Sequence, residues 1–121
     1  MKKRIFISTG EVSGDLQGAL LVEALYRQAK KMRLELEVLA LGGDRMKSAG
    51  ATLLGNTTEI GSIGIIEGLP YLFPTMKVQK QAKEFLRQNP PDLFVMMDYA
   101  DPNISIGLYA RKHLPQVPTV F

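Results

Sequence analysis

Cysteine and tryptophan are absent from this sequence of 121 residues, and histidine occurs once. Without cysteine there is no disulfide framework, no thiolate metal ligand and no cysteine nucleophile. The one histidine, His113, follows two basic residues where a helix is predicted to end, which favours a surface role beside the negative end of the helix dipole. No metal-ligand spacing occurs anywhere, so the sequence predicts neither a metal site nor another cofactor.

Long hydrophobic runs and a strong charge bias are also lacking. No apolar run approaches the roughly 18 residues that a membrane-spanning helix needs. The composition, 45% hydrophobic and 22% charged, is typical of a globular domain. The formal net charge of +3 permits nucleotides, phosphorylated small molecules or acidic lipid surfaces as partners without selecting among them. No nucleic-acid partner is expected.

Short apolar runs alternate with amphipathic stretches along the chain. Helices are predicted at 14–32, 44–50 and 101–114, and a helical pattern broken by two prolines covers 65–87. Strands are predicted at 3–8, 36–43, 51–55, 91–98 and 117–121. Because these strands are apolar on both faces, they are typical of a parallel sheet with helices on both faces. The predicted fold class is therefore α/β.

The first predicted helix, 14–32, has a clear amphipathic pattern. Ser13 or Asp15 is predicted to be its N-cap. Charged side chains are expected on the outer side, at Glu23, Arg27, Lys30 and Lys31. The inner side is expected to contain Gly18, Leu21, Val22, Leu25, Ala29 and Met32.

The last predicted strand has hardly begun when the sequence stops at Phe121. A sheet strand rarely ends a protein two or three residues after it starts. We therefore expect the sequence to be a piece of a longer chain, with residues 1–121 forming part of one domain.

The segment S-T-G-E-V-S-G-D follows the first predicted strand and leads into the first predicted helix. In open α/β sheets, ligands bind at the carboxyl ends of the strands. Gly10 and Gly14 would let the backbone approach a ligand closely, and the free N–H groups of the helix start favour anions. The dinucleotide fingerprint, the P-loop and the nucleophile elbow are all absent.

Two interpretations of this segment remain open. In the first it is a plain turn, in which Gly10 turns, Ser13 caps the helix and Asp15 complements its positive end. In the second it contacts a ligand, because Glu11 is a carboxylate at a place where helix capping does not need one.

Asp98 ends the most apolar predicted strand, so its carboxylate is expected to emerge at the same edge of the sheet. Partial desolvation would make this carboxylate more basic, which suits a general base. The alternative is that Asp98 caps a helix or hydrogen-bonds to the loop at Gly10. Asp101 precedes Pro102 and is predicted to be an N-cap, and Asn103 is expected on the helix surface unless it reaches the cleft.

Several segments together resemble the amino-terminal part of the lipid-A-disaccharide synthase family. They are G-E-V-S-G-D with the following L-Q-G-A-L-L-V-E-A-L, then L-G-G-D-R-M-K-S-A-G, I-G-I-I-E-G-L, P-D-L-F-V-M-M-D-Y-A-D-P-N and V-P-T-V-F, in this order. The family's first loop reads G-E-A-S-G-D, so Val12 replaces an alanine. Its second motif reads D-A-P-D-F-N, and Asp98, Asp101 and Asn103 keep that spacing while the proline has moved.

The resemblance implies an inverting glycosyltransferase with two Rossmann-like domains, the GT-B type. Residues 1–121 would be the first part of the acceptor-side N-terminal domain, and a UDP-binding C-terminal domain would follow. The family transfers diacylated glucosamine from its UDP donor to diacylglucosamine 1-phosphate, forming the β-1,6 lipid A disaccharide without a metal. These enzymes are cytoplasmic and peripherally associated with the inner membrane, and a homo-oligomer is possible.

The resemblance also implies roles for individual residues. Asp98 would be catalytic, and substrate would be bound by Gly10, Glu11, Ser13, Gly14, Asp15, Asp101 and Asn103. Residues 1–121 alone are expected to be inactive. The alternative function is a stand-alone nucleotide- or phosphate-binding module without catalysis, and the sequence beyond Phe121 would decide between the two.

The proline-broken segment 63–87 combines an apolar stripe with basic residues. In one interpretation the stripe packs in the core beneath a solvated basic face. In the other it contacts the acyl chains of a twice-acylated substrate and a membrane surface. The basic residues are Lys77, Lys80, Lys83 and Arg87, and the stripe consists of Ile65, Ile66, Leu69, Leu72, Phe73 and Met76.

Overall fold

The computed structural model describes residues 2–9, 12–56, 80–97 and 101–120, and of these it gives the backbone alone for 12, 13, 56 and 101–105. Within this part of the chain, five parallel strands form one sheet in the order β3-β2-β1-β4-β5. The strands are β1 (Lys2–Ser8), β2 (Glu35–Gly42), β3 (Thr52–Asn56), β4 (Leu93–Met96) and β5 (Thr119–Val120).

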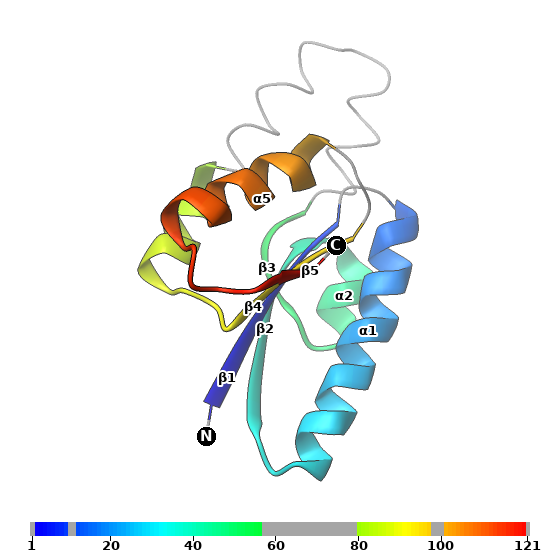
Figure 1. Ribbon diagram of the computed structural model, residues 1–121. Coiled ribbons are helices and arrows are strands. Elements are labelled where there is room, and N and C mark those ends of the chain that lie inside the picture. The colour runs from blue at the N-terminus through cyan, green and yellow to red at the C-terminus, as the bar shows by residue number, and fades with distance from the viewer. Residues whose placement is uncertain (1, 10–11, 57–79, 98–100, 121) are drawn as a thin grey trace.

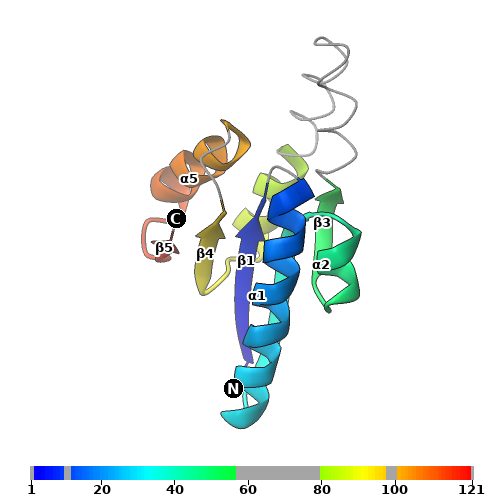
Figure 2. The ribbon, with the colours of Figure 1, turned by 90° about the vertical axis from the view of Figure 1, so that its right-hand side faces the viewer.

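Helices cover both faces of the sheet, as Figures 1 and 2 show. One face carries α1 (Val12–Lys31) and α2 (Asp44–Ser48). The other carries α5 (Asp101–His113) and the helical residues 80–88. The predicted α/β class is confirmed, and the strand order is that of a Rossmann-like sheet.

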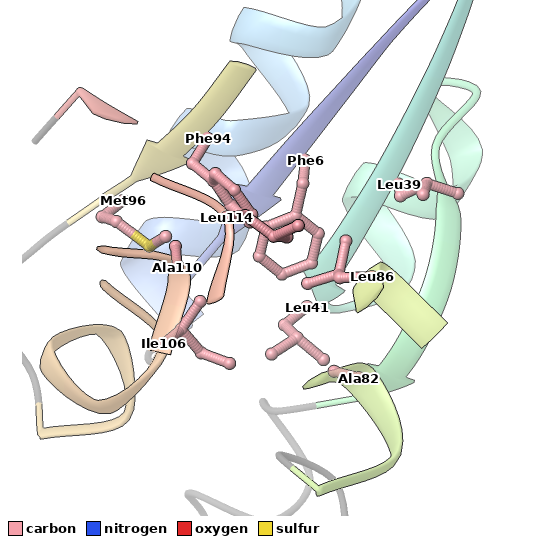
Figure 3. Packing of buried hydrophobic residues seen from close by; sticks show 10 residues of the cluster. All are labelled: Phe6, Leu39, Leu41, Ala82, Leu86, Phe94, Met96, Ile106, Ala110 and Leu114. Atoms are coloured by element: carbon pink, nitrogen blue, oxygen red, sulfur yellow. The ribbon is translucent and has the colours of Figure 1, made fainter. Parts of the chain in front are cut away.

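Alternate residues of each central strand point to opposite faces, and both faces are covered by helices, which explains why the buried carboxyl-terminal halves of β1 and β2 are largely apolar on both faces. On the α5 face, the Phe6 and Phe94 rings meet edge to face with centroids 5.8 Å apart. Figure 3 shows this core, which is made of Phe6, Leu39, Leu41, Ala82, Leu86, Phe94, Met96, Ile106, Ala110 and Leu114. The core on the α1 face is made of Ile7, Ala19, Val22, Val38, Ala40, Met46 and Ala51.

The predicted strands and helices are confirmed to within about two residues wherever the structure describes them. The helix predicted over 44–50 is expected to be closed by its final glycine, and this is confirmed: α2 ends at Ser48, and Gly50 has a φ of +116° that other residues rarely adopt, with its N–H donating to the carbonyl of Lys47. Of the predicted helical pattern over 65–87, only the part from residue 80 lies within the described residues.

Two predictions about the first helix are wrong. The helix begins at Val12 rather than residue 14, so Ser13 and Asp15 lie inside it and neither is its N-cap. Met32 follows the last helical residue and is 59% exposed, so it does not belong to the inner side. The four charged residues predicted for the outer side are indeed exposed.

Candidate functional site

The strand order reverses at β1, because β2 and β3 lie on one side of it and β4 and β5 on the other. Such a switch point is where open α/β sheets bind their ligands, at the carboxyl ends of the strands. The ends of β1 and β4 are therefore the candidate site.

Hydrogen bonds join the end of β1 to the ends of both neighbouring strands, β4 and β2. The N–H of Met97 donates to the carbonyl of Ser8 at 2.9 Å. On the other side of β1, Thr9 donates to the carbonyl of Leu41 twice, through its N–H at 2.8 Å and through Oγ1 at 3.0 Å. Ser8 and Thr9 are both buried. The segments that follow β1 and β4 thus begin side by side at the switch point.

Asp15 connects the start of α1 to the turn between β2 and α2. Its Oδ1 accepts from the N–H of Gly43 at 2.9 Å and of Met46 at 3.1 Å, and Oδ2 accepts from the N–H of Arg45 at 3.2 Å. The N-cap of α2 is Gly43, which has no side chain to satisfy these donors. Asp15 therefore caps α2 from another helix.

Two glycines let α2 approach this closely. A Cβ atom on Gly18 of α1 would lie 2.7 Å from Sδ of Met46, and a Cβ atom on Gly42 of β2 would also collide with that sulfur. Met46 is fully buried between them. Asp15 and Gly18 are three residues apart and therefore lie on the same face of α1. This face contacts the G-G-D-R-M sequence that begins at Gly42, Asp15 through backbone N–H groups and Gly18 through Met46.

Comparison with known proteins gives the family. Residues 5–121 match the sequence profile described as lipid-A-disaccharide synthetase. The chain belongs to this family. It is 60% identical to the lipid-A-disaccharide synthase of Gloeothece citriformis and 53% identical to that of Synechocystis, in each case over 98% of this chain. The chain spans only about a third of the length of these relatives, 31% and 30% respectively.

Solved structures show the same fold. The calicheamicin glycosyltransferase CalG4 has a TM-score of 0.58 at 21% identity, over 98% of this chain and 31% of its own. MurG of Acinetobacter baumannii has a TM-score of 0.56 at 19% identity, over 97% of this chain and 33% of its own. A C-terminal domain of PF1911 hydrogenase from Pyrococcus furiosus scores 0.57 at 13% identity, over 97% of this chain and 88% of its own. Such different proteins share the fold, so the fold alone does not set the function.

The structure describes only some of the predicted site residues of this family member. Gly14 and Asp15 are buried in the first turns of α1, beside the β2–α2 turn. The backbones of Ser13, Asp101 and Asn103 lie at the starts of α1 and α5, but their side chains are outside the described part. Also outside it are Gly10, Glu11 and Asp98, and the apolar stripe of Ile65, Ile66, Leu69, Leu72, Phe73 and Met76.

Sequence reasoning missed Thr9, which ties β1 to β2 with two hydrogen bonds. Its position directly after an apolar strand and before Gly10 was the available signal.

The surface role predicted for His113 is confirmed, because this residue is exposed at the end of α5. The centroid of its ring lies 4.5 Å from that of Tyr109. Among the basic residues of the proline-broken segment 63–87, Lys80 and Arg87 are exposed. Nζ of Lys83 lies 5.6 Å from the centroid of the Tyr109 ring, within the range of a cation–π contact.

Within the described residues, no group of three or more histidine, cysteine or carboxylate side chains could hold a metal ion. Among the helices of that same part, none is long and apolar enough to cross a membrane.

Proposed function

We propose that this chain provides the acceptor-side part of a lipid-A-disaccharide synthase. The whole enzyme would transfer diacylglucosamine from UDP to diacylglucosamine 1-phosphate, with inversion at the sugar carbon. Because the chain spans about a third of its curated relatives, we assign the main UDP site to a second domain beyond these residues. The family match over residues 5–121 supports this assignment.

One observation carries the proposal, the hydrogen bond from Met97 N–H to the carbonyl of Ser8. Through it, the G-E-V-S-G-D segment and the segment beginning at Asp98 both start from one point of the sheet. A reaction that needs a binding loop and a base next to each other requires this arrangement.

In the proposed reaction, Asp98 takes the proton from the acceptor hydroxyl. The hydroxyl oxygen then attacks the sugar carbon from the side opposite UDP, which leaves as the new glycosidic bond forms. Glu11, Ser13 and the backbone at Gly10 and Gly14 would orient the acceptor, together with Asp101 and Asn103 from the start of α5. Neither a metal nor another cofactor has a role in this scheme.

We further propose that the enzyme works in the cytoplasm at the inner-membrane surface, because both of its substrates would be acylated. The apolar stripe at 65–76 would contact acyl chains, and the exposed Lys80 and Arg87 would favour an anionic lipid surface. A homo-oligomer is compatible with this arrangement.

The test is an assay of the full-length protein with the UDP donor and the sugar phosphate acceptor. We expect UDP release and a disaccharide of the corresponding mass, both dependent on the acceptor. Binding of the donor or of inorganic phosphate without any disaccharide would contradict the proposal and would instead indicate a nucleotide- or phosphate-binding module.

A further inference from the structure

The carboxylate of Asp15 is nearly fully engaged by the protein's own backbone. The residue is only 5% exposed, and its two oxygens accept three N–H hydrogen bonds. A carboxylate offers about four acceptor sites, so hardly any of its capacity remains for a substrate. This environment differs from that of a substrate ligand, whose polar atoms need to be open to the site.

The bonds of Asp15 belong to a larger arrangement. Thr9, at the end of β1, donates twice to the carbonyl of Leu41. Asp15, in the first turn of α1, accepts from Gly43, Arg45 and Met46. Both ends of the segment 9–15 are therefore fastened to the same short stretch of chain, residues 41–46.

We propose that Asp15 is a positioning residue for the reaction proposed above, and that it acts by fixing the start of α1 against the β2–α2 turn without contacting substrate. The inference rests on the proposed function for its catalytic consequence. The packing of Gly18 and Gly42 against Met46 supports it, because α2 approaches α1 and β2 most closely at the residue whose N–H also donates to Asp15.

Asp15→Asn tests this role with the smallest change of shape. The amide oxygen of asparagine can still accept from Gly43 and Met46, which share one oxygen in the structure. The amide nitrogen then faces the N–H of Arg45, so a donor meets a donor. Asp15→Ala removes all three bonds and is the more severe variant.

Two readouts are compared in the full-length enzyme. Hydrogen exchange of peptides covering residues 41–47 should become about tenfold faster in Asp15→Asn, because the hydrogen bond from the N–H of Arg45 is lost. The turnover number should fall roughly 10- to 100-fold, because a displacement of about 1 Å can cost that much, while the KM of each substrate changes little. Asp15→Glu, with a longer side chain, should not restore turnover.

Tyr26→Phe is the matched control. It removes one hydrogen bond between the same two parts of the fold, from the Tyr26 hydroxyl to the carbonyl of Gly50 at 3.1 Å, but at the other end of α1. Exchange should become faster around residues 48–52, and turnover should stay within about twofold of the unaltered enzyme.

Four results would overturn the inference. They are a raised KM with unchanged turnover number in Asp15→Asn, lost turnover without faster exchange at 41–47, faster exchange with unchanged kinetics, and an equal loss of turnover in Tyr26→Phe. If the unaltered protein shows no turnover, the proposed function fails, and the positioning role fails with it. In that case hydrogen exchange at residues 41–47 still shows whether Asp15 holds the β2–α2 turn in place. A failure of the proposed function can therefore be distinguished from a failure of the structural role of Asp15.

Discussion

The contact of Met46 with two glycines allows a quantitative prediction. The strand variant Gly42→Ala places a Cβ atom in collision with Sδ of Met46 and 3.3 Å from Oγ1 of Thr9. Met46 is flexible but fully buried, so its sulfur can move only by repacking against its neighbours, and Thr9 is held by a hydrogen bond to Leu41. Overpacking of this kind costs about 1–3 kcal/mol of unfolding free energy.

The equivalent change in α1 should cost less. In Gly18→Ala the new Cβ atom lies 2.7 Å from the same sulfur, about 1 Å inside normal contact. Alanine is however more favourable than glycine inside a helix by about 1 kcal/mol, which offsets part of the overlap. We expect Gly18→Ala to destabilise the protein by about 0–2 kcal/mol, and Gly42→Ala by more.

A double-mutant cycle tests the cause. Met46→Ala alone should cost about 2–5 kcal/mol, because a buried side chain is lost. Adding Gly42→Ala to it should cost little further or restore stability, since the colliding sulfur is gone, and the interaction free energy should be about 1–3 kcal/mol. The assay is urea unfolding, with Leu108→Ala on the exposed face of α5 as a control that should change stability little. Additive costs at 42 and 46 would refute the reasoning.

Two further predictions concern the ion pairs and the isolated chain. Glu37 contacts Lys2 at 3.3 Å and Arg4 at 3.1 Å at the partly exposed amino-terminal end of the sheet. Glu37→Gln should therefore lower the unfolding free energy by less than about 1 kcal/mol, a difference that about 1 M salt abolishes in thermal unfolding; a larger, salt-insensitive loss would contradict this. Residues 1–121 produced alone should not release UDP from the donor, because the proposed UDP site lies elsewhere; measured turnover would contradict the domain assignment.

Much of the fold could be predicted from the sequence because local patterns determine it. Apolar runs such as that of β2 gave the strands, and the spacing of Gly18, Val22 and Ala29 gave the inner side of α1. The order of the strands could not be derived from periodicity, since it depends on contacts between distant residues.

The role of Asp15 shows where sequence reasoning about the site ended. A carboxylate near the start of a helix is expected to serve that helix, and the local pattern favours this interpretation. The donors that it binds are instead 28 to 31 residues away, on a turn whose own N-cap is a glycine. The pair of glycines before D-R-M was visible in the sequence, but only the fold shows that Asp15 supplies the missing cap.

The central claim is that the reaction takes place where β1 and β4 end, with Asp98 as the general base. Asp98→Asn in the full-length enzyme keeps the shape of the side chain and removes the base. Asp92→Asn is the matched control. Asp92 directly precedes β4, at the end of the strand opposite to the candidate site, and its carboxylate accepts from the N–H of Arg4 at 2.8 Å.

The decisive measurement is the turnover of the UDP donor by both variants, with donor affinity measured separately. The account predicts that Asp98→Asn lowers turnover by roughly 10²–10⁴-fold with nearly unchanged donor affinity, while Asp92→Asn stays within about twofold. Near-normal turnover in Asp98→Asn would contradict it.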